Sequence, residues 1–216
     1  MTERFALLAF RMILTKAWFW RWANRSQSQA IFLTPDQGFR SLWLQTEAQG
    51  QAYQLLELWH DGNALKSAQP CSPALIPHAS NLILLNYWLD ALGFMAKELA
   101  DANYLCRWYP RLLAQLQRPA VWQRLWPLLE WQLIAQAGFW PSTEALVTDQ
   151  CYQLTNHGVV VKQMGLSARQ LSDIAQGEFS QEMPCDLVAW HAFARPLLKQ
   201  ELSSELYQFR LFLETL

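Results

Sequence analysis

The first third of the chain alternates short apolar runs with turn residues, a pattern typical of β-strands. These runs predict strands at 16–24, 29–34, 39–45 and 52–60, and the stretch 63–67 that follows them can pair as a fifth strand. Thr34-Pro35-Asp36-Gln37-Gly38 predicts a hairpin turn, because Pro35 presets φ and Gly38 adopts positive φ without strain. Asp61-Gly62-Asn63 predicts a second tight turn. Five strands in about sixty residues favour a small closed barrel over an open sheet.

The strand at 16–24 carries three tryptophans at alternate positions. In a regular strand Trp18, Trp20 and Trp22 share one face, and Phe19 and Arg21 share the other. Such a strand could stack nucleic-acid bases, anchor at a membrane surface or fill a core. Barrel strands need large residues for packing, so we expect most of these tryptophans to pack in the core or between domains. Arg21 is then a better contact residue than the indoles, because a cation seldom points into a barrel unpaired.

After Pro73 and Pro77 the apolar period changes to three and four residues, which predicts helices. This period is clearest at Leu82, Leu85, Leu89, Leu92, Ala96 and Leu99. Further helices are expected at 104–116, 122–137, 167–175, from 186 onward and 203–215. Gly138 predicts a C-cap, and Ser167 with Gln170 predicts a capping box. The segment 155–163 resembles a turn that leads into a short extended piece. We therefore predict an α+β chain: an extension at 1–15, a five-stranded β-barrel at 16–73 and an all-helical domain at 74–216.

Composition adds a charge asymmetry to this picture. The 216 residues are 52% hydrophobic and 16% charged, include twelve tryptophans, and have a net charge of −1. Residues 1–40 hold six cations against two acids, whereas residues 141–216 hold five cations against nine acids. The total charge does not indicate a nucleic-acid-binding protein. A basic N-terminal part and an acidic C-terminal part are nevertheless consistent with a different function at each end of the chain.

The spacing of the cysteines and the apolar N-terminal run indicate in which cellular compartment the protein is expected. Cys71, Cys106, Cys151 and Cys185 lie far apart with no Cys-x-x-Cys spacing, which predicts free cytosolic thiols rather than a zinc site or disulfides. Arg11 and Lys16 interrupt the apolar N-terminal run, which is too short to span a membrane. We therefore expect a cytoplasmic protein without a membrane segment, for which Met12 is a possible start.

Catalytic signatures do not emerge from the sequence. The histidines His60, His78, His157 and His191 show no metal-ligand spacing, and no nucleophile elbow, phosphate loop or dinucleotide fingerprint occurs. We expect neither an enzyme nor a metal or cofactor site.

The order of a five-stranded barrel and a helical domain resembles the bacterial recombination mediator RecO family. The family's Phe-Glu-x-x-Leu-Leu-x-x-x-Gly-Tyr helix is similar to residues 129–139, LEWQLIAQAGF. Its later tyrosine segment, its glycine and its Leu-x-x-x-x-Glu-Phe helix resemble 151–154, 158–160 and 171–179. The hairpin FLTPDQGFRSLWLQ resembles one in the family's OB barrel, and YWLDALGFMAKEL resembles its first long helix. The final helix pair is similar to residues 194–213, and the resemblance spans residues 16 to 214.

The resemblance implies an OB-like barrel and a non-enzymatic DNA repair and recombination mediator. Such a protein binds single- and double-stranded DNA, anneals strands, docks the acidic tail of the single-stranded-DNA-binding protein, and helps RecR load the recombinase. The family's basic loop after the third strand corresponds here to 46–51, which has no cation and one acid. Its zinc module has no counterpart in this sequence.

Two sets of residues are candidates for these roles. Lys16, Arg21, Arg25 and Arg40 are the expected phosphate contacts, with Trp43 as a stacking residue. Arg118 and Arg124 are the expected contacts for the acidic tail. The alternatives are an adaptor of the same fold that has lost DNA binding, and a peripheral membrane protein anchored by residues 1–23.

Overall fold

The computed structural model describes residues 12–23, 26–44, 53–96, 98–119, 121–139, 146–147, 149–176 and 187–215, to which all structural statements refer. The expected N-terminal extension up to residue 11, Arg25, the loop at 46–51 and Cys185 lie outside these residues. The chain forms two compact units. The first runs to Leu75 and includes Ala102–Cys106, and the second contains Ile76–Asp101 and Arg107–Leu216.

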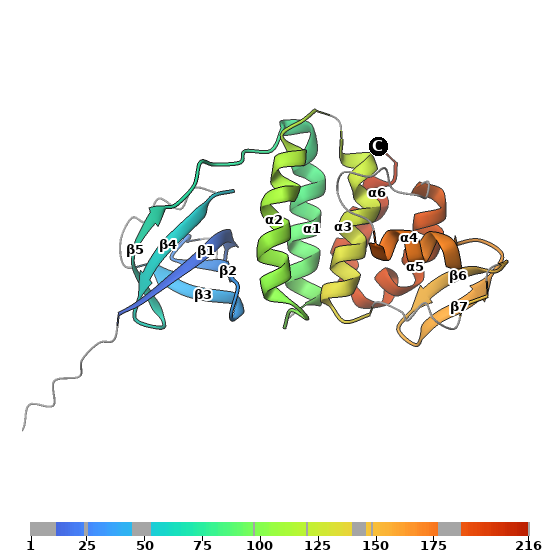
Figure 1. Ribbon diagram of the computed structural model, residues 1–216, viewed down its shortest axis with the longest axis horizontal. Helices are drawn as coiled ribbons and strands as arrows, with labels where there is room; N and C mark the ends of the chain where they lie inside the picture. The colour runs from blue at the N-terminus through green and yellow to red at the C-terminus, as the bar shows by residue number, and fades with distance from the viewer. Residues whose placement is uncertain are drawn as a thin grey trace, which may run out of the picture. The chain divides into compact units, whose positions relative to one another are not determined.

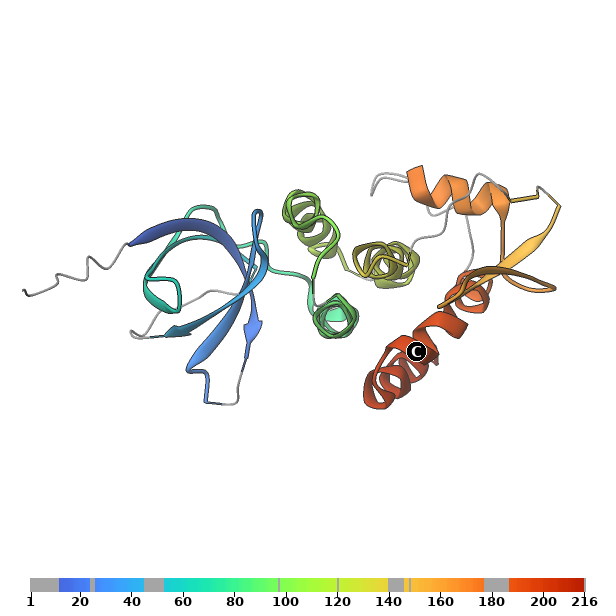
Figure 2. The same cartoon turned by 90° about the horizontal axis from the view of Figure 1, so that it is seen from below.

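The first unit is a five-stranded sheet that closes on itself (Figures 1 and 2). Its strands are β1 (Ile13–Trp22), β2 (Gln29–Thr34), β3 (Gly38–Leu44), β4 (Leu55–His60) and β5 (Ala64–Pro70). The order is β1-β2-β3-β5-β4, and β4 pairs again with β1. Every ladder is antiparallel except β3–β5, which is parallel. The mixed α and β class that the sequence predicts is confirmed.

The interior of the barrel is apolar. Inward positions alternate along the strands, because successive side chains of a strand point to opposite sides. The buried interior cluster consists of Ala17, Phe19, Ala30, Phe32, Leu42, Leu56, Leu58 and Leu65. Phe19 and Phe32 face each other edge to face, with ring centroids 5.8 Å apart. The packing of large residues thus accounts for the apolar alternation of these strands.

Both predicted turns of the barrel are confirmed. Gly38 has φ of 66°, and Thr34 Oγ1 donates to its carbonyl oxygen at 3.0 Å. In the second turn, Asp61 Oδ1 accepts from the N–H groups of Asn63 and Ala64 at 3.1 and 2.8 Å. Lys66 Nζ, 2.9 Å from Asp61 Oδ2, and next these two bonds hold the pKa of Asp61 well below its usual range.

A bulge in β1 overturns the expectation that Phe19 and Arg21 share a face. Phe19 lies opposite Phe32, but Arg21 lies opposite Ile31, with a register shift between them. Directly opposed residues of an antiparallel pair lie on the same side of the sheet. Because Phe32 belongs to the interior cluster and Ile31 does not, Arg21 lies on the outer side of the barrel. The alternation rule failed here because one extra residue in the strand reverses the parity after it.

Trp18 and Trp20 are packing residues, as predicted. Their side chains are 6% and 4% exposed, and the Trp20 ring lies 4.8 Å from that of Phe39. The side chain of Trp22 is outside the described set. For two of the three tryptophans, burial rather than stacking on a ligand accounts for the aromatic content.

Helices dominate the rest of the chain (Figure 1). They are η1 (Ala79–Asn81), α1 (Leu82–Met95), α2 (Ala102–Leu116), α3 (Trp122–Gln136), α4 (Ala168–Gln176), α5 (Leu187–Glu201) and α6 (Ser204–Leu213). Pro110, Pro127 and Pro196 lie inside α2, α3 and α5. The Gly138 C-cap is confirmed, with φ of 81° and an N–H donated to Ala135 O. The capping box is also confirmed, since Ser167 and Gln170 exchange backbone-to-side-chain bonds.

The prediction of an all-helical second domain is wrong. A three-stranded sheet of order β7-β6-β8 lies between α3 and α4 in the chain: β6 (Cys151–Thr155), β7 (Gly158–Lys162) and β8 (Leu166–Ser167). The β-branched run Val159–Val161 favours a strand over a helix. Gly158, with φ of 102°, allows the two-residue turn that pairs it with Thr155. The segment predicted as one extended piece is therefore half of a hairpin.

Candidate nucleic-acid interface

Lys16 lies on the exposed surface of β1, but an acid neighbours it. Its cross-strand partner on β4 is Glu57, and Lys16 Nζ lies 3.8 Å from Glu57 Oε1. The Lys16 side chain is 63% exposed, so solvent weakens this ion pair. The ammonium group can still reach a phosphate, although Glu57 reduces the local positive charge.

Arg21 and Trp43 flank β2 on the outer side of the barrel. Arg21 lies opposite Ile31 of β2, whereas Trp43 of β3 lies opposite Gln29 of the same strand. The Arg21 side chain is half-buried, and the Trp43 side chain is 52% exposed. The fold thus places a cation and an accessible indole on either side of one strand, the pair of groups that single-strand binding uses.

Arg40 holds the barrel together at one end. It shares strand parity with inward-facing Leu42, and its guanidinium donates to Gln37 Oε1 and, at 2.8 Å, to Gly62 O. These bonds join the turn between β2 and β3 to the turn between β4 and β5. The guanidinium of Arg40 is therefore engaged within the protein.

His60 is buried beside this end of the barrel. Gly62 N–H donates to His60 Nδ1 at 3.1 Å, so Nε2 carries the proton and donates to Thr15 Oγ1 at 3.0 Å. Burial, and next the positive charge of Arg40, lower the pKa of His60. A neutral histidine at this position closes the barrel interior rather than offering a charge to a ligand.

Trp59 is an exposed aromatic residue that sequence reasoning missed. It is 38% exposed on β4 and lies opposite Leu14, which is 49% exposed. The signal was present: Leu56, Leu58 and His60 alternate inward, so Trp59 must point outward. It adds an accessible indole to the β1–β4 side, where Lys16 also lies.

Arg118 and Arg124 are both exposed and both belong to the second unit. Arg118 lies in the turn after α2, and Arg124 lies in the first turn of α3. Both guanidinium groups are accessible to an acidic partner.

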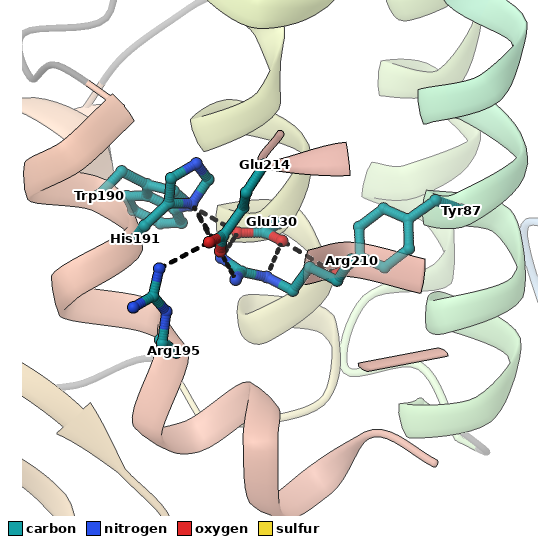
Figure 3. Close-up of polar contacts among 7 residues, drawn as sticks. All are labelled: Tyr87, Glu130, Trp190, His191, Arg195, Arg210 and Glu214. Atoms are coloured by element: carbon teal, nitrogen blue, oxygen red, sulfur yellow. Dashed lines mark hydrogen bonds and ion pairs between the residues drawn. The ribbon is translucent and has the colours of Figure 1, made fainter. Parts of the chain in front are cut away.

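The best-defined polar arrangement of the second unit is a buried ion pair that the sequence did not predict (Figure 3). Glu130 of α3 and Arg210 of α6 are both fully buried. Arg210 Nε lies 2.6 Å from Glu130 Oε1, and Arg210 NH2 donates to Oε2 at 2.9 Å. Tyr87 Oη and Trp190 Nε1 donate to the same carboxylate at 2.9 and 2.7 Å. Burial raises the pKa of Glu130, but the Arg210 charge and its hydrogen bonds outweigh burial and lower it overall.

Three further side chains continue the cluster toward the surface. Arg210 NH2 donates to His191 Nδ1 at 3.0 Å, and its NH1 pairs with Glu214. Arg195, which is 48% exposed, donates to Glu214 Oε2 at 2.6 Å. Burial is the main reason why the pKa of His191 is lowered, which agrees with an Nδ1 that accepts from a guanidinium. The cluster joins α1, α3, α5 and α6, and its sealed core serves packing rather than contact with a substrate.

A sequence signal for this cluster existed but was incomplete. Glu130 stands within the otherwise apolar inner face of a helix, and a charged residue there requires a partner. Nothing in the sequence identifies Arg210, eighty positions away, as that partner. The resemblance to a Phe-Glu helix marked the position without giving its role.

Two comparisons with known proteins returned no match. No protein-family model matches the chain, and no curated protein matches it. Among the described residues, no helix is long and apolar enough to cross a membrane, and no group of three or more His, Cys, Asp or Glu side chains could hold a metal ion.

Proposed function

We propose that this chain is a non-enzymatic DNA repair and recombination mediator with an OB-like barrel. In this proposal the barrel binds single- and double-stranded DNA and promotes annealing. The second unit docks the acidic tail of the single-stranded-DNA-binding protein through Arg118 and Arg124, and RecR is a further partner. The proposed site of action is the cytoplasm.

The observation that carries the proposal is the closed five-stranded barrel with Arg21 and Trp43 on either side of β2. OB-folds are five-stranded Greek-key barrels that bind oligonucleotides on the face of strands 2 and 3 and on the adjoining loops. Arg21 would contact phosphate, and Trp43 would stack on a base, since every base has a π face. Lys16 and Arg25 would add phosphate contacts, whereas Arg40 contributes chiefly by holding the two turns together.

Fluorescence anisotropy with a labelled single-stranded oligonucleotide tests this proposal. The wild-type chain should bind at low salt. Arg21→Glu should weaken binding about tenfold or more, because it replaces a charge-assisted phosphate contact with a repulsion. Trp43→Ala should cost about 1–3 kcal/mol of binding free energy for one stacked base. Lys199→Glu makes the same change of charge at an exposed position of α5 and should leave the affinity unchanged. Equal affinities of Arg21→Glu and wild type would contradict the assignment.

The engagement of two barrel cations favours a second candidate, an adaptor of the same fold without DNA binding. Lys16 pairs with Glu57, and Arg40 binds Gly62 O. Both contacts reduce the charge available for phosphates. The adaptor predicts no oligonucleotide binding even at low salt, together with retained binding of an acidic peptide. The same titrations therefore separate the two functions.

A further inference from the structure

A strongly basic segment of the second unit has no place in the barrel-centred site. Residues 107–129 contain four arginines and neither Asp nor Glu, although the whole chain has a net charge of −1. All four side chains are exposed: Arg107, Arg111, Arg118 and Arg124. The ion pairs found among the described residues do not involve them. The positive charge of this segment is therefore presented to solvent.

Two of these arginines share one face of α2, and a third follows directly after the helix. Arg107 and Arg111 are four residues apart, so they lie on the same face, about 6 Å apart along the helix axis. Arg118 follows in the turn after α2, where its N–H donates to Gln115 O at 3.2 Å. The opposite face of α2 is fixed to α1, because Trp108 and Tyr109 pack against Trp88 with ring centroids 5.5 and 6.3 Å away. This packing keeps the arginine face turned outward.

The turn that carries Arg118 is held in place from within. Asn81 is fully buried, and its amide Nδ2 donates to Leu116 O at 2.8 Å and to Arg118 O at 2.7 Å. These bonds satisfy carbonyl groups that the end of α2 leaves without intrahelical partners. These bonds fix the backbone of Arg118 relative to the end of α2.

We propose that Arg107, Arg111 and Arg118 form a second track for a nucleic-acid phosphate backbone, additional to the barrel residues. This inference rests on the proposed DNA-binding function and assigns Arg118 to nucleic acid rather than to the acidic tail. Phosphates of one strand of duplex DNA recur every ~3.4 Å of helix axis, so Arg107 and Arg111, about 6 Å apart along the axis of α2, reach separate phosphates. With the barrel, the track gives one molecule two nucleic-acid surfaces, so that it can hold two strands at once.

The neighbours of the track favour phosphate over an acidic peptide. The exposed positions beside the arginines are Asn103, Ala114, Gln117 and Pro119. A tight peptide interface needs a large buried anchor at its centre, usually aromatic or aliphatic. Several exposed cations with small and polar neighbours instead match a ligand with repeated negative charges and no apolar side chains.

Anisotropy titrations of the full chain over a salt series test the track. The variant is Arg107→Ala/Arg111→Ala, in which alanine preserves the helix. Its matched control is Lys199→Ala, which removes an exposed cation from α5. The double variant should lose about tenfold or more in affinity for a labelled single strand, and its slope of log K against log salt should fall by about 1.4. Arg107→Lys/Arg111→Lys should restore most of the slope, because phosphate accepts either cation. Circular dichroism and thermal melting verify that each variant is folded.

The outcomes separate the track from the proposed function. If the wild-type chain binds no DNA at low salt, the proposed function fails and the track fails with it. If the wild type binds and the double variant keeps both its affinity and its salt slope, the track is wrong while the proposed function stands. If the double variant loses affinity only for a labelled decaglutamate peptide, the arginines form a peptide site and the inference is overturned.

Discussion

The interiors of the two units of this chain contain different kinds of side chain. The barrel encloses an apolar cluster, and its charged groups stay at the strand ends and on the outer side. The second unit is organised around Glu130 and Arg210, both fully buried and bonded through two oxygens. In an apolar core, the free-energy cost of removing side-chain volume grows with the size of the cavity that remains. A buried ion pair fails as a whole when one partner is removed, because the other charge remains without compensation.

The buried pair also explains a division of labour among the arginines. Arg210 has no exposure and is used entirely for structure. Arg107, Arg111 and Arg124 are exposed and leave the packing of the second unit to other residues. Substitutions of the first kind should alter stability, and substitutions of the second kind should alter binding.

The largest expected effect is loss of one member of the buried pair. Arg210→Met should lower the free energy of unfolding by about 3–5 kcal/mol, because Glu130 then stays buried without its counter-charge. Glu130→Gln/Arg210→Met should be less destabilising than the sum of the single changes, with a coupling of about 0.5–3 kcal/mol. Urea unfolding at neutral pH measures all three variants.

A control variant in the same cluster shows whether the loss of stability in Arg210→Met is due to burial of the ion pair. Arg195→Met removes an ion pair to Glu214 whose arginine is 48% exposed. It should cost no more than about 1 kcal/mol. If Arg210→Met costs as little as Arg195→Met, the buried pair does not organise the second unit.

The barrel should respond to a cavity instead. Leu58 is 1% exposed within the apolar cluster, and Leu58→Ala should cost about 2–5 kcal/mol. No charge is involved, so the cost should be the same at pH 5 and pH 8. Chemical unfolding at both pH values measures it. A penalty that changes strongly with pH would show that titratable groups control the barrel interior.

Acid should act on the ionic cluster by a smaller and graded amount. The pKa of folded His191 lies below its ordinary value of 6.5, mainly because burial disfavours the charged form. The unfolded chain therefore binds this proton more readily, and stability should fall as the pH drops from 6.5 toward the pKa of folded His191. The contribution of Glu130, whose pKa is also lowered, is present above 4.5 and is lost as the pH falls through its folded value.

His191→Gln isolates the histidine part of this dependence. Glutamine can still accept the Arg210 hydrogen bond but does not titrate. The change of unfolding free energy between pH 5 and pH 7 should shrink in this variant, leaving the contribution of His60, whose pKa is lowered in the barrel. An unaltered pH dependence would place the titrating group elsewhere.

The smallest expected effect is at the barrel surface. Lys16→Gln breaks a pair with Glu57 in which the lysine is 63% exposed, and it should change stability by about 0.2–1 kcal/mol at most. Its effect on DNA affinity should be larger than its effect on stability. Thermal melting and anisotropy on the same sample make this comparison, and a stability loss well above 1 kcal/mol would show that Lys16 is structural.

The sequence predicted correctly those elements of the fold that depend only on a few neighbouring residues. The turns at Gly38 and Gly62, the Gly138 cap and the Ser167 capping box follow from the conformational needs of a few neighbouring residues. Alternation also predicted the apolar side of the strands. It failed at Arg21, since a bulge depends on pairing with a second strand and leaves no mark on periodicity.

Long-range features escaped prediction for the same reason. The pairing of Glu130 with Arg210 joins residues from α3 and α6, and the sequence of neither helix indicates that the other packs against it. Arg40 looked like any surface cation until the fold brought Gly62 O to its guanidinium. Residue type predicted which groups could carry charge, whereas only the fold shows which of them are already engaged.

The central claim is that exposed cations of this chain bind a nucleic-acid backbone while the buried ones hold the fold. The most direct test is the salt dependence of wild-type binding to a labelled single strand, measured by anisotropy from about 50 to 200 mM salt. If exposed cations bind the phosphates, log K should fall linearly with log salt, with a slope near −0.7 for each phosphate contacted. Absence of binding at about 50 mM, or an affinity that does not change with salt, would contradict this claim.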